Sequence, residues 1–163
     1  MLCYRLVSAG EAVYFEDIRV GEEYSSPGRT VTEADIVIFA GLSGDYNVLH
    51  TDAEHMKASL FGERIAHGLL GLSALSGLMM EMDILKGTVE AFLGLTWRFT
   101  GPIRFGDEVR GEIAVQAKRL SRKGQGIVTF DLKLKNQKDE TVQEGEFTLM
   151  VRRRGAEPPR MSF

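Results

Sequence analysis

The second half of the chain alternates apolar and polar positions, a pattern typical of strands that bury one face. In IVTFDLKL the apolar residues Val128, Phe130 and Leu132 are each followed by a polar residue. Four such segments are separated by short clusters of turn residues: TVEAFLGLTWRFTGPI, DEVRGEIAVQAKRL, GQGIVTFDLKLKNQ and ETVQEGEFTLMVRRR. Because short turns join antiparallel neighbours, the pattern predicts four strands in an antiparallel meander.

The segment IAHGLLGLSALSGLMMEMDIL is apolar on every side. This predicts a helix over about residues 65–82 that is buried all round. A glycine inside a helix costs about 1 kcal/mol relative to alanine. Gly71 and Gly77 therefore indicate that a neighbouring element approaches the backbone of this helix closely.

An earlier segment, VTEADIVIFAGL, predicts a helix over about residues 33–42, since its apolar residues recur at helical spacing. Thr32 followed three residues later by Asp35 resembles a capping box, with Asp in place of the usual Glu or Gln. Residues 43–51 are a loop by composition, and a short helix is predicted over about 52–58.

The order of these elements, helices first and strands afterwards, predicts an α+β fold in which the sheet wraps round the long helix. With 163 residues, of which 44% are hydrophobic, the chain fits one globular domain. We expect a single domain over residues 1–163, with its core over about 13–153 and a loose tail over 154–163.

Charge, hydrophobic run length and cysteine content argue against a nucleic-acid partner, a membrane span and an internal disulfide. The formal net charge of −3 gives no general attraction to nucleic acid or to an anionic membrane. Apolar runs stay shorter than the roughly 18 residues of a membrane span. Cys3 is the only cysteine, so no disulfide forms within the chain. The N-terminal residues lack the apolar region of a signal peptide, and we expect a cytoplasmic protein.

All three histidines of the chain lie in one segment, GDYNVLHTDAEHMKASLFGERIAHGLL, over residues 44–70. Asp45 and His50 are spaced so that both side chains could reach one water molecule, one as general base and the other as general acid. The amide of Asn47 would orient either side chain or the water. The same residues also fit local turn contacts beside a surface histidine, and the spacing alone does not decide between these interpretations.

A metal site is a further interpretation of this segment. Its donors would come from the histidines and two nearby carboxylates, namely Asp45, His50, Asp52, His55 and His67. Their spacings match no HExxH or Cys/His pattern, and no cysteine lies near them. We therefore expect no metal and assign no role to His55.

His67 and Gly68 begin the predicted long helix. Free backbone N–H groups at a helix N-terminus bind an anion or a developing oxyanion, and a glycine there lets a ligand approach the backbone. Gly68 fits tight packing equally well, and His67 could be a structural residue whose ring bonds to backbone. Covalent catalysis has little support, because Cys3 is terminal and no serine lies in a nucleophile elbow.

Taken together, these segments resemble the MaoC-like family, the (R)-specific enoyl-CoA hydratases. The run TVTEADIVIFAGLSGDYNVLHTDAEHMKASLFGERIAHGLL is similar to the hydratase signature of that family. YFEDIRVGEEYSSPGRTVTEADI is similar to its lead-in, and WRFTGPIRFGDEVRGEI to its strand, turn and next strand. The resemblance covers about residues 13–151.

The resemblance implies a hot dog fold, in which a curved antiparallel sheet wraps a long central helix. It implies a homodimer or higher homo-oligomer, with an acyl-CoA thioester substrate entering at the interface between subunits. The implied reaction is (R)-specific hydration of trans-2-enoyl-CoA to (R)-3-hydroxyacyl-CoA, or the reverse dehydration. We expect no separate cofactor, since coenzyme A is part of the substrate.

Residue by residue, the resemblance implies roles for five positions. Asp45 and His50 match the catalytic pair of the family, and Asn47 matches the amide beside them. Gly68 matches the backbone donor that holds the thioester carbonyl. Ser76 matches a hydroxyl that supports the aspartate.

One position departs from the family pattern. Val48 stands where proline is usual, and proline would stiffen this loop by fixing φ. We expect the change from proline to valine at this position to affect the geometry of the loop and the preference for substrate. The nearest alternatives keep the fold and change the substrate, to a 3-hydroxyacyl carrier-protein thioester or to a branched or dicarboxylic acyl-CoA. A hot dog thioesterase would make poor use of the Asp/His pair, and the intact set of site residues argues against a non-catalytic acyl-binding subunit.

Overall fold

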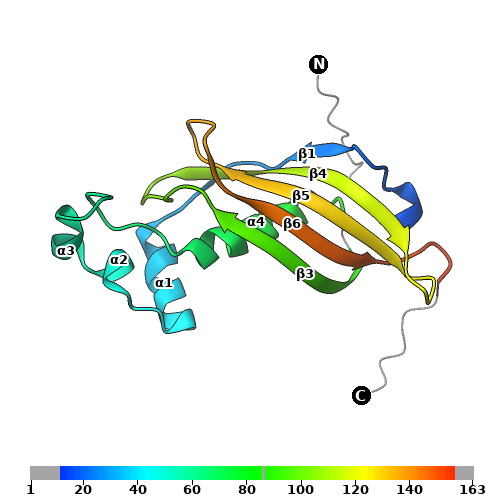
Figure 1. The fold of residues 1–163 in the computed structure, drawn as a ribbon, viewed down its shortest axis with the longest axis horizontal. Helices are drawn as coiled ribbons and strands as arrows, with labels where there is room; N and C mark the ends of the chain where they lie inside the picture. The colour runs from blue at the N-terminus through cyan, green and yellow to red at the C-terminus, as the bar shows by residue number, and fades with distance from the viewer. Residues whose placement is uncertain (1–11, 86, 157–163) are drawn as a thin grey trace.

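A curved antiparallel sheet forms the body of the protein, in a computed structural model that describes residues 12–85 and 87–156. The elements in chain order are a 3₁₀ turn (Phe15–Asp17), β1 (Glu23–Ser25), β2 (Arg29–Thr30), α1 (Glu33–Ser43), α2 (Val48–Thr51), α3 (Ala53–Lys57), α4 (Gly68–Glu81), β3 (Val89–Phe99), β4 (Glu108–Leu120), β5 (Gly126–Lys135) and β6 (Thr141–Val151). The four strands expected from the alternating pattern are confirmed. Figure 1 shows α1, α2 and α3 together at one end of the sheet.

The strand order is β1-β4-β5-β6-β3, with β2 also paired to β4, and every pairing is antiparallel. The predicted meander therefore holds for β4 to β6 but is wrong for β3, which pairs with β6 instead of β4. The segment after β3 does not form a hairpin because it is bonded to the segment before α4. Ala66 N donates to Ile103 O at 2.8 Å, and Ile65 forms an isolated bridge with Arg104.

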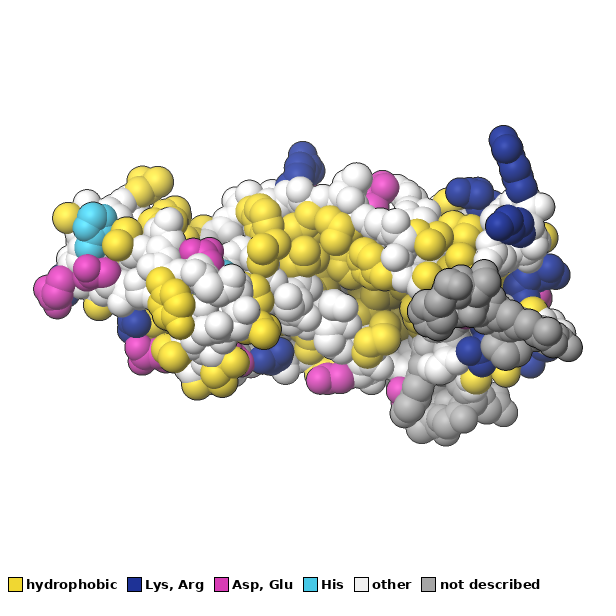
Figure 2. Space-filling model, turned by 90° about the horizontal axis from the view of Figure 1, so that it is seen from below, with side chains coloured by type: hydrophobic (Ala, Val, Ile, Leu, Met, Phe, Trp, Pro, Cys, Tyr) yellow, Lys and Arg dark blue, Asp and Glu magenta, His cyan; other side chains and the backbone are white. Residues whose placement is uncertain are grey.

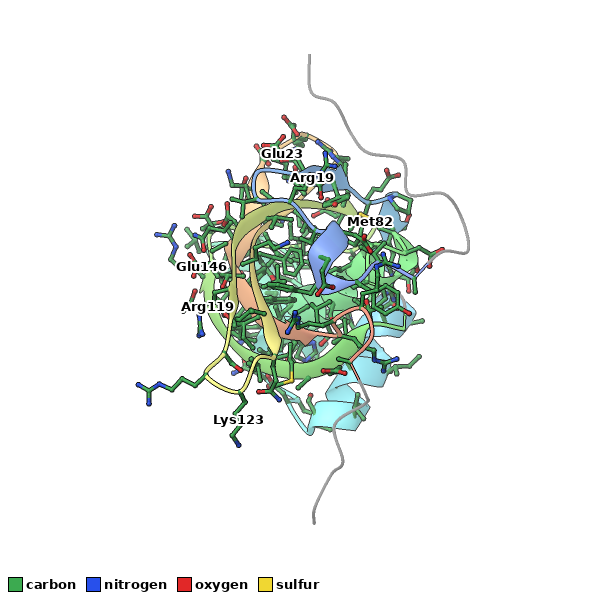
Figure 3. All side chains as sticks on the ribbon, turned by 90° about the vertical axis from the view of Figure 1, so that its right-hand side faces the viewer. Arg19, Glu23, Met82, Arg119, Lys123 and Glu146 are labelled. Atoms are coloured by element: carbon green, nitrogen blue, oxygen red, sulfur yellow. The ribbon has the colours of Figure 1, made fainter. Side chains whose placement is uncertain are left out.

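The same bonds explain where the long helix begins. Ile65 and Ala66 are extended against residues 103 and 104, so α4 begins at Gly68 rather than at the predicted residue 65. α4 lies against the sheet, which curves round it in the end view of Figure 3. The helix contributes Leu70, Ala74, Leu75, Leu78 and Met79 to the core, and β4, β5 and β6 contribute inward-facing residues that include Ile113, Phe130, Leu132, Phe147 and Leu149.

The prediction that α4 is buried all round is wrong. One face of the helix is exposed, with Leu69 57% and Met80 43% accessible, because the sheet covers only the opposite face. The close approach predicted at Gly71 is confirmed, since a methyl group there would lie 2.3 Å from Nε2 of Gln143. The one predicted at Gly77 is wrong, because a methyl group at that exposed position would meet no described atom within 4 Å.

α1 positions the segment that follows it, and its predicted capping box is confirmed. Thr32 Oγ1 accepts from Asp35 N, and Asp35 Oδ2 accepts from Thr32 N at 2.8 Å. The Thr32 N–H holds the pKa of the Asp35 carboxyl below its usual value. The helix ends at Gly44, whose φ of 76° turns the chain sharply away from the helix axis.

Both ends of the described chain lie away from α1, α2 and α3 in Figure 1. Arg154 is ion-paired to Asp17, whereas residues 157–163 of the predicted loose tail lie outside the described residues. In the part of the chain that the structure describes, no helix is long and apolar enough to cross a membrane. A long helix wrapped by a curved antiparallel sheet is the hot dog fold that the resemblance implied.

Candidate active site

Asp45 lies in the sharp turn after α1, and backbone and side-chain bonds hold it there. Its N–H donates to Ser43 Oγ at 3.2 Å, and its Oδ1 accepts from Asn47 N at 3.2 Å. The side chain is 53% exposed. The contact of Asn47 with Asp45 therefore comes from its backbone N–H.

His50 lies on α2, a four-residue helix in the segment that composition predicted to be a loop. Asn47 is the N-cap of this helix, and its Oδ1 accepts from Leu49 N at 3.0 Å. The His50 side chain is only 9% exposed, and its Nδ1 lies 2.8 Å from Ile65 O. Because a carbonyl oxygen only accepts, Nδ1 carries the proton, and in the neutral form of the ring Nε2 has a free lone pair.

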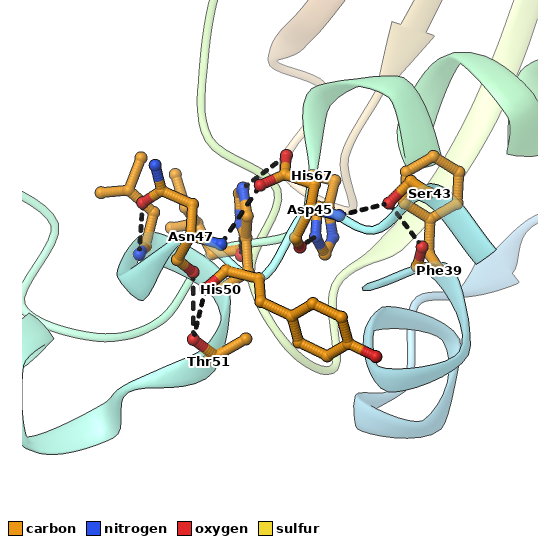
Figure 4. A network of polar contacts seen from close by, with 10 residues as sticks. Phe39, Ser43, Asp45, Asn47, His50, Thr51 and His67 are labelled. Atoms are coloured by element: carbon orange, nitrogen blue, oxygen red, sulfur yellow. Dashed lines mark hydrogen bonds and ion pairs between the residues drawn. The ribbon is translucent and has the colours of Figure 1, made fainter. Parts of the chain in front are cut away.

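The free lone pair of His50 faces Asp45. His50 Nε2 lies 4.0 Å from Asp45 Oδ2, which is too long for a direct hydrogen bond. Figure 4 shows the Asp45 carboxylate, from the turn after α1, and the His50 ring, from α2, brought together beside His67. A buried imidazole therefore faces an open carboxylate across a gap that a small molecule can bridge.

His67 adds a second imidazole that the sequence did not assign to the site. Its ring stacks on the His50 ring with centroids 3.7 Å apart and planes at 29°. Its Nε2 lies 2.9 Å from the backbone oxygen of Asp45. A histidine directly before the helix was noted in the sequence, but its neighbours, Asp45 in the turn after α1 and His50 on α2, lie more than a dozen residues away, so no local pattern reveals the contact.

Gly68 is the first residue of α4, and its N–H belongs to the first turn, where backbone donors have no acceptor within the helix. A methyl group on Gly68 would lie 2.7 Å from Cε1 of Phe99, so glycine is needed for this close approach. His50 and Gly68 both line a cavity of about 730 Å³. Its wall is mostly apolar and includes Leu49, Phe61, Ile65, Leu69, Phe99 and Ile103.

Gln143 on β6 ties the beginning of α4 to the sheet and was missed by the sequence reasoning. Its Nε2 donates to Gly68 O at 3.0 Å, and its Oε1 accepts from Trp97 Nε1 at 3.1 Å. The residue is buried with 1% exposure. The available sequence signal was a polar residue in register with the apolar Phe147 and Leu149 of the TVQEGEFTLMV strand, because a polar group on the inner face of a strand needs a partner.

Two further residues, Ser76 and His55, lie apart from this group. Ser76 is exposed on α4, two turns beyond Gly68, and no hydrogen bond joins it to Asp45. The structure therefore does not bring Ser76 to the aspartate within one chain. His55 is exposed on α3.

Among the residues that the structure describes, Asp45, His50 and His67 form a group that could hold a metal, with ligand atoms within 4.8 Å of one another. The stacked rings fit a metal poorly, however. Imidazole lone pairs lie in the ring plane, and these two planes are nearly parallel at 29° and 3.7 Å apart. The two lone pairs therefore do not converge on one point as tetrahedral coordination requires.

Val48 occupies the first position of α2, where proline is well tolerated because its N–H has no acceptor within the helix. Asn47 has φ −55° and ψ 142°, the extended conformation that a following proline favours. The substitution Val48→Pro is therefore expected to raise the free energy of unfolding by about 0.4–1 kcal/mol, measured by denaturant titration. Leu49→Pro is the control and should destabilise, because Leu49 N donates to Asn47. An unchanged or lower stability of Val48→Pro would show that the loop geometry differs.

Comparisons with known proteins identify the family. The chain matches the MaoC-like domain over residues 16–136. It is 34% identical over 142 residues to an (R)-specific enoyl-CoA hydratase of Rhodospirillum rubrum, covering 87% of this chain and 94% of that protein.

Solved structures agree with this assignment. A protein from Archaeoglobus described as a monoamine oxidase regulatory protein superposes with a TM-score of 0.84 at 36% identity, over 91% of this chain and 99% of that one. An unliganded (R)-hydratase from Pseudomonas aeruginosa gives a TM-score of 0.74 at 30% identity, over 93% of this chain and 97% of that one. The domain match spans most of the chain, and curated relatives are named for adding or removing water. The chain therefore belongs to the MaoC-like dehydratase family and is a hydro-lyase.

Proposed function

We propose that this enzyme hydrates trans-2-enoyl-CoA to (R)-3-hydroxyacyl-CoA, or catalyses the reverse dehydration, by means of a water held between Asp45 and His50. The observation that carries the proposal is the pairing of the bare His50 Nε2 with Asp45 Oδ2 across 4.0 Å, beside the free N-terminus of α4. The names of the relatives from Rhodospirillum and Pseudomonas support the same reaction.

The 4.0 Å separation suits one bridging water. A water that bonds both atoms at about 2.8 Å sees them at an angle of roughly 90°, close to the angle between its own O–H bonds. Such a water donates to the carboxylate and to the imidazole lone pair at once, which leaves its oxygen lone pairs free. Its oxygen would attack C3 of the enoyl thioester as it loses one proton to the pair.

The other proton movement can use the same pair. As the water oxygen bonds to C3, the electron pair of the C2=C3 double bond moves to C2 and onto the thioester oxygen. The proton taken from water then returns to C2, so that water adds to both carbons from one face. Because His50 presents a free lone pair at Nε2 in its neutral form, the ring is able to accept the proton while the carboxylate holds the water in place.

The negative charge that grows on the thioester oxygen needs a hydrogen-bond donor, and we assign this role to the Gly68 N–H. It lies in the first turn of the fourteen-residue helix α4, where the backbone donors and the helix dipole favour negative charge. The apolar cavity of about 730 Å³ that contains both His50 and Gly68 is suited to the acyl part of the substrate.

The direct test is the ultraviolet absorbance of crotonyl-CoA incubated with the purified protein, followed by chiral analysis of the product. Loss of the enoyl band with formation of the (R)-3-hydroxy product is the expected result. An intact band with crotonyl-CoA would lead to longer, branched, dicarboxylic and carrier-protein thioesters, and failure of all of them would contradict the proposal. Release of free thiol, followed with a thiol reagent, would instead indicate a thioesterase.

We also expect two copies of the chain to pair through β3, which is an edge strand of the sheet. An unpaired edge is a site for strand addition, and here it carries the exposed side chains Phe92, Leu93, Leu95 and Phe99. Figure 2 shows a hydrophobic band along the middle of the molecule, seen from the side on which β3 lies in Figure 1. A second copy would also cover the exposed apolar residues of α4 and narrow the opening around Asp45.

The substitution Leu95→Lys places a charge in the middle of this edge and is expected to dissociate the dimer. Light scattering should then give the chain mass of 18.1 kDa, whereas the parent gives twice that value. Leu60→Lys is the matched control, because Leu60 is 94% exposed in the turn after α3 and should leave the mass unchanged. A parent protein that is monomeric at micromolar concentration would contradict the expectation.

A further inference from the structure

His67 is a buried histidine in direct contact with the proposed catalytic pair, and the reaction described above gives it no task. It is only 2% exposed. It occupies the N-cap position of α4 but its side chain makes no capping hydrogen bond. Since Ser, Thr, Asp and Asn are the residues that stabilise this position, helix capping does not explain a histidine here.

The first contact of His67 is with the backbone of Asp45. The acceptor is a carbonyl oxygen, so His67 Nε2 carries the proton and donates it over 2.9 Å. This bond joins the turn that carries the Asp45 carboxylate to the helix that begins with Gly68. The bond therefore holds the proposed water site at Asp45 and the proposed carbonyl site at Gly68 in a defined arrangement.

The second contact of His67 is with the ring of His50. The two rings stack at 3.7 Å, and Phe39 packs against His67 at 5.1 Å with its plane tilted by 53°. The His50 ring is thus held at Nδ1 by the bond to Ile65 O and on one face by His67. Together these contacts direct its bare Nε2 toward Asp45.

His67 is retained at a cost in stability. With Nε2–H donating to Asp45, Nδ1 has a buried lone pair, and it is the one buried side-chain nitrogen or oxygen without a hydrogen-bond partner in residues 12–85 and 87–156. A phenylalanine, although larger, would bring no unpaired buried nitrogen. Side chains that violate such a rule are expected at functional positions.

We infer that His67 is a positioning residue, which sets the Asp45 turn through its Nε2–H and the His50 ring through its stacked face. This inference rests on the proposed function. It assigns to His67 no contact with the substrate, and it predicts that the turnover number depends on the histidine while substrate binding and folding do not.

The test compares two substitutions that separate the two contacts. His67→Phe keeps an aromatic face for His50 but loses the donor to Asp45, and it is expected to lower kcat by about tenfold to a hundredfold, the effect of a displacement of about 1 Å. KM should change by less than about threefold, and Tm should stay close to that of the parent, because removal of the buried lone pair offsets the larger ring and the lost bond to Asp45. His67→Gln restores an N–H donor and should recover part of kcat. The matched control is His55→Phe, the same change at an exposed histidine.

The results separate failure of this inference from failure of the proposed function. A parent protein without hydratase activity refutes the proposed function, whereas an active parent with kcat of His67→Phe within about twofold refutes only the inference. A fall of kcat that follows a fall of Tm, with no recovery in His67→Gln, also overturns it. Long-range ¹H–¹⁵N spectra of the three imidazoles in the parent provide a check independent of any substitution, since a protonated His67 Nδ1 with a bare Nε2 would exclude the bond to Asp45.

Discussion

Asp45→Asn is expected to lower kcat/KM for the enoyl thioester by about 10²-fold to 10⁴-fold, the range that a positioned acid–base group contributes. The amide keeps the shape of the side chain, and its oxygen still accepts from the N–H of Asn47, which holds the carboxylate now at 3.2 Å. It removes the charge that orients the water opposite His50. His50→Ala is expected to give a loss of similar size, because it removes the bare Nε2.

The measurement is initial-rate kinetics with thermal unfolding of the same samples. Asp52→Asn is the matched control, since Asp52 is an exposed carboxylate seven residues away that caps α3 through His55 N. Asparagine caps a helix about as well as aspartate, so this control should keep both activity and Tm. Activity that survives either Asp45→Asn or His50→Ala at the parent level would refute the assignment of the water site.

Gly68→Ala is expected to lower kcat/KM by about 10²-fold or more, although the substitution retains the backbone N–H. The added methyl group would lie 2.7 Å from Cε1 of Phe99 and would therefore displace that ring, which lines the same cavity as Gly68. A displaced thioester carbonyl loses a donor whose removal costs about 10²-fold to 10³-fold in comparable sites. Within one chain Phe99 is 55% exposed, so its ring is able to shift without disturbing the buried core.

Gly41→Ala provides the matched control for this substitution. Its methyl group would meet Tyr46 Oη at 3.7 Å, an ordinary contact distance, and it lies in the interior of α1. It should leave kcat/KM unchanged and raise stability slightly, because alanine is the better helix former. Equal kinetics for the Gly68→Ala variant and the parent would show that the thioester carbonyl is held elsewhere.

The helix starts and strands that local rules govern were predicted correctly. The Thr32–Asp35 capping box marks the beginning of α1, and the alternation in IVTFDLKL marks a strand. α2 was missed because four residues are too few for a periodic pattern, and the helix depends on the single cap at Asn47. The beginning of α4 was placed three residues early, because Ile65 and Ala66 are apolar but bond to residues 103 and 104 instead of continuing the helix.

The residues of the candidate site also fall into two groups, those that a motif in the sequence indicates and those whose contacts only the structure reveals. The family resemblance named Asp45, Asn47, His50 and Gly68, and the structure places these four residues around one small region. The roles of Gln143 and His67 depend on partners far along the chain, at Gly68 and Trp97 in one case and at Asp45 and His50 in the other. Ser76, named in the same way, lies exposed on α4 and away from the aspartate of its own chain.

Hydrophobic period, caps and motif spacing act over a few residues, and they were enough to predict the fold class, most elements and the segment that carries the proposed chemistry. The pairing of β3 with β6, the open face of α4 and the stacking of two imidazoles beside one carboxylate emerge from the tertiary structure alone. These features depend on which distant backbone groups satisfy one another and on how the sheet curves. Neither is encoded in the spacing of neighbouring residues.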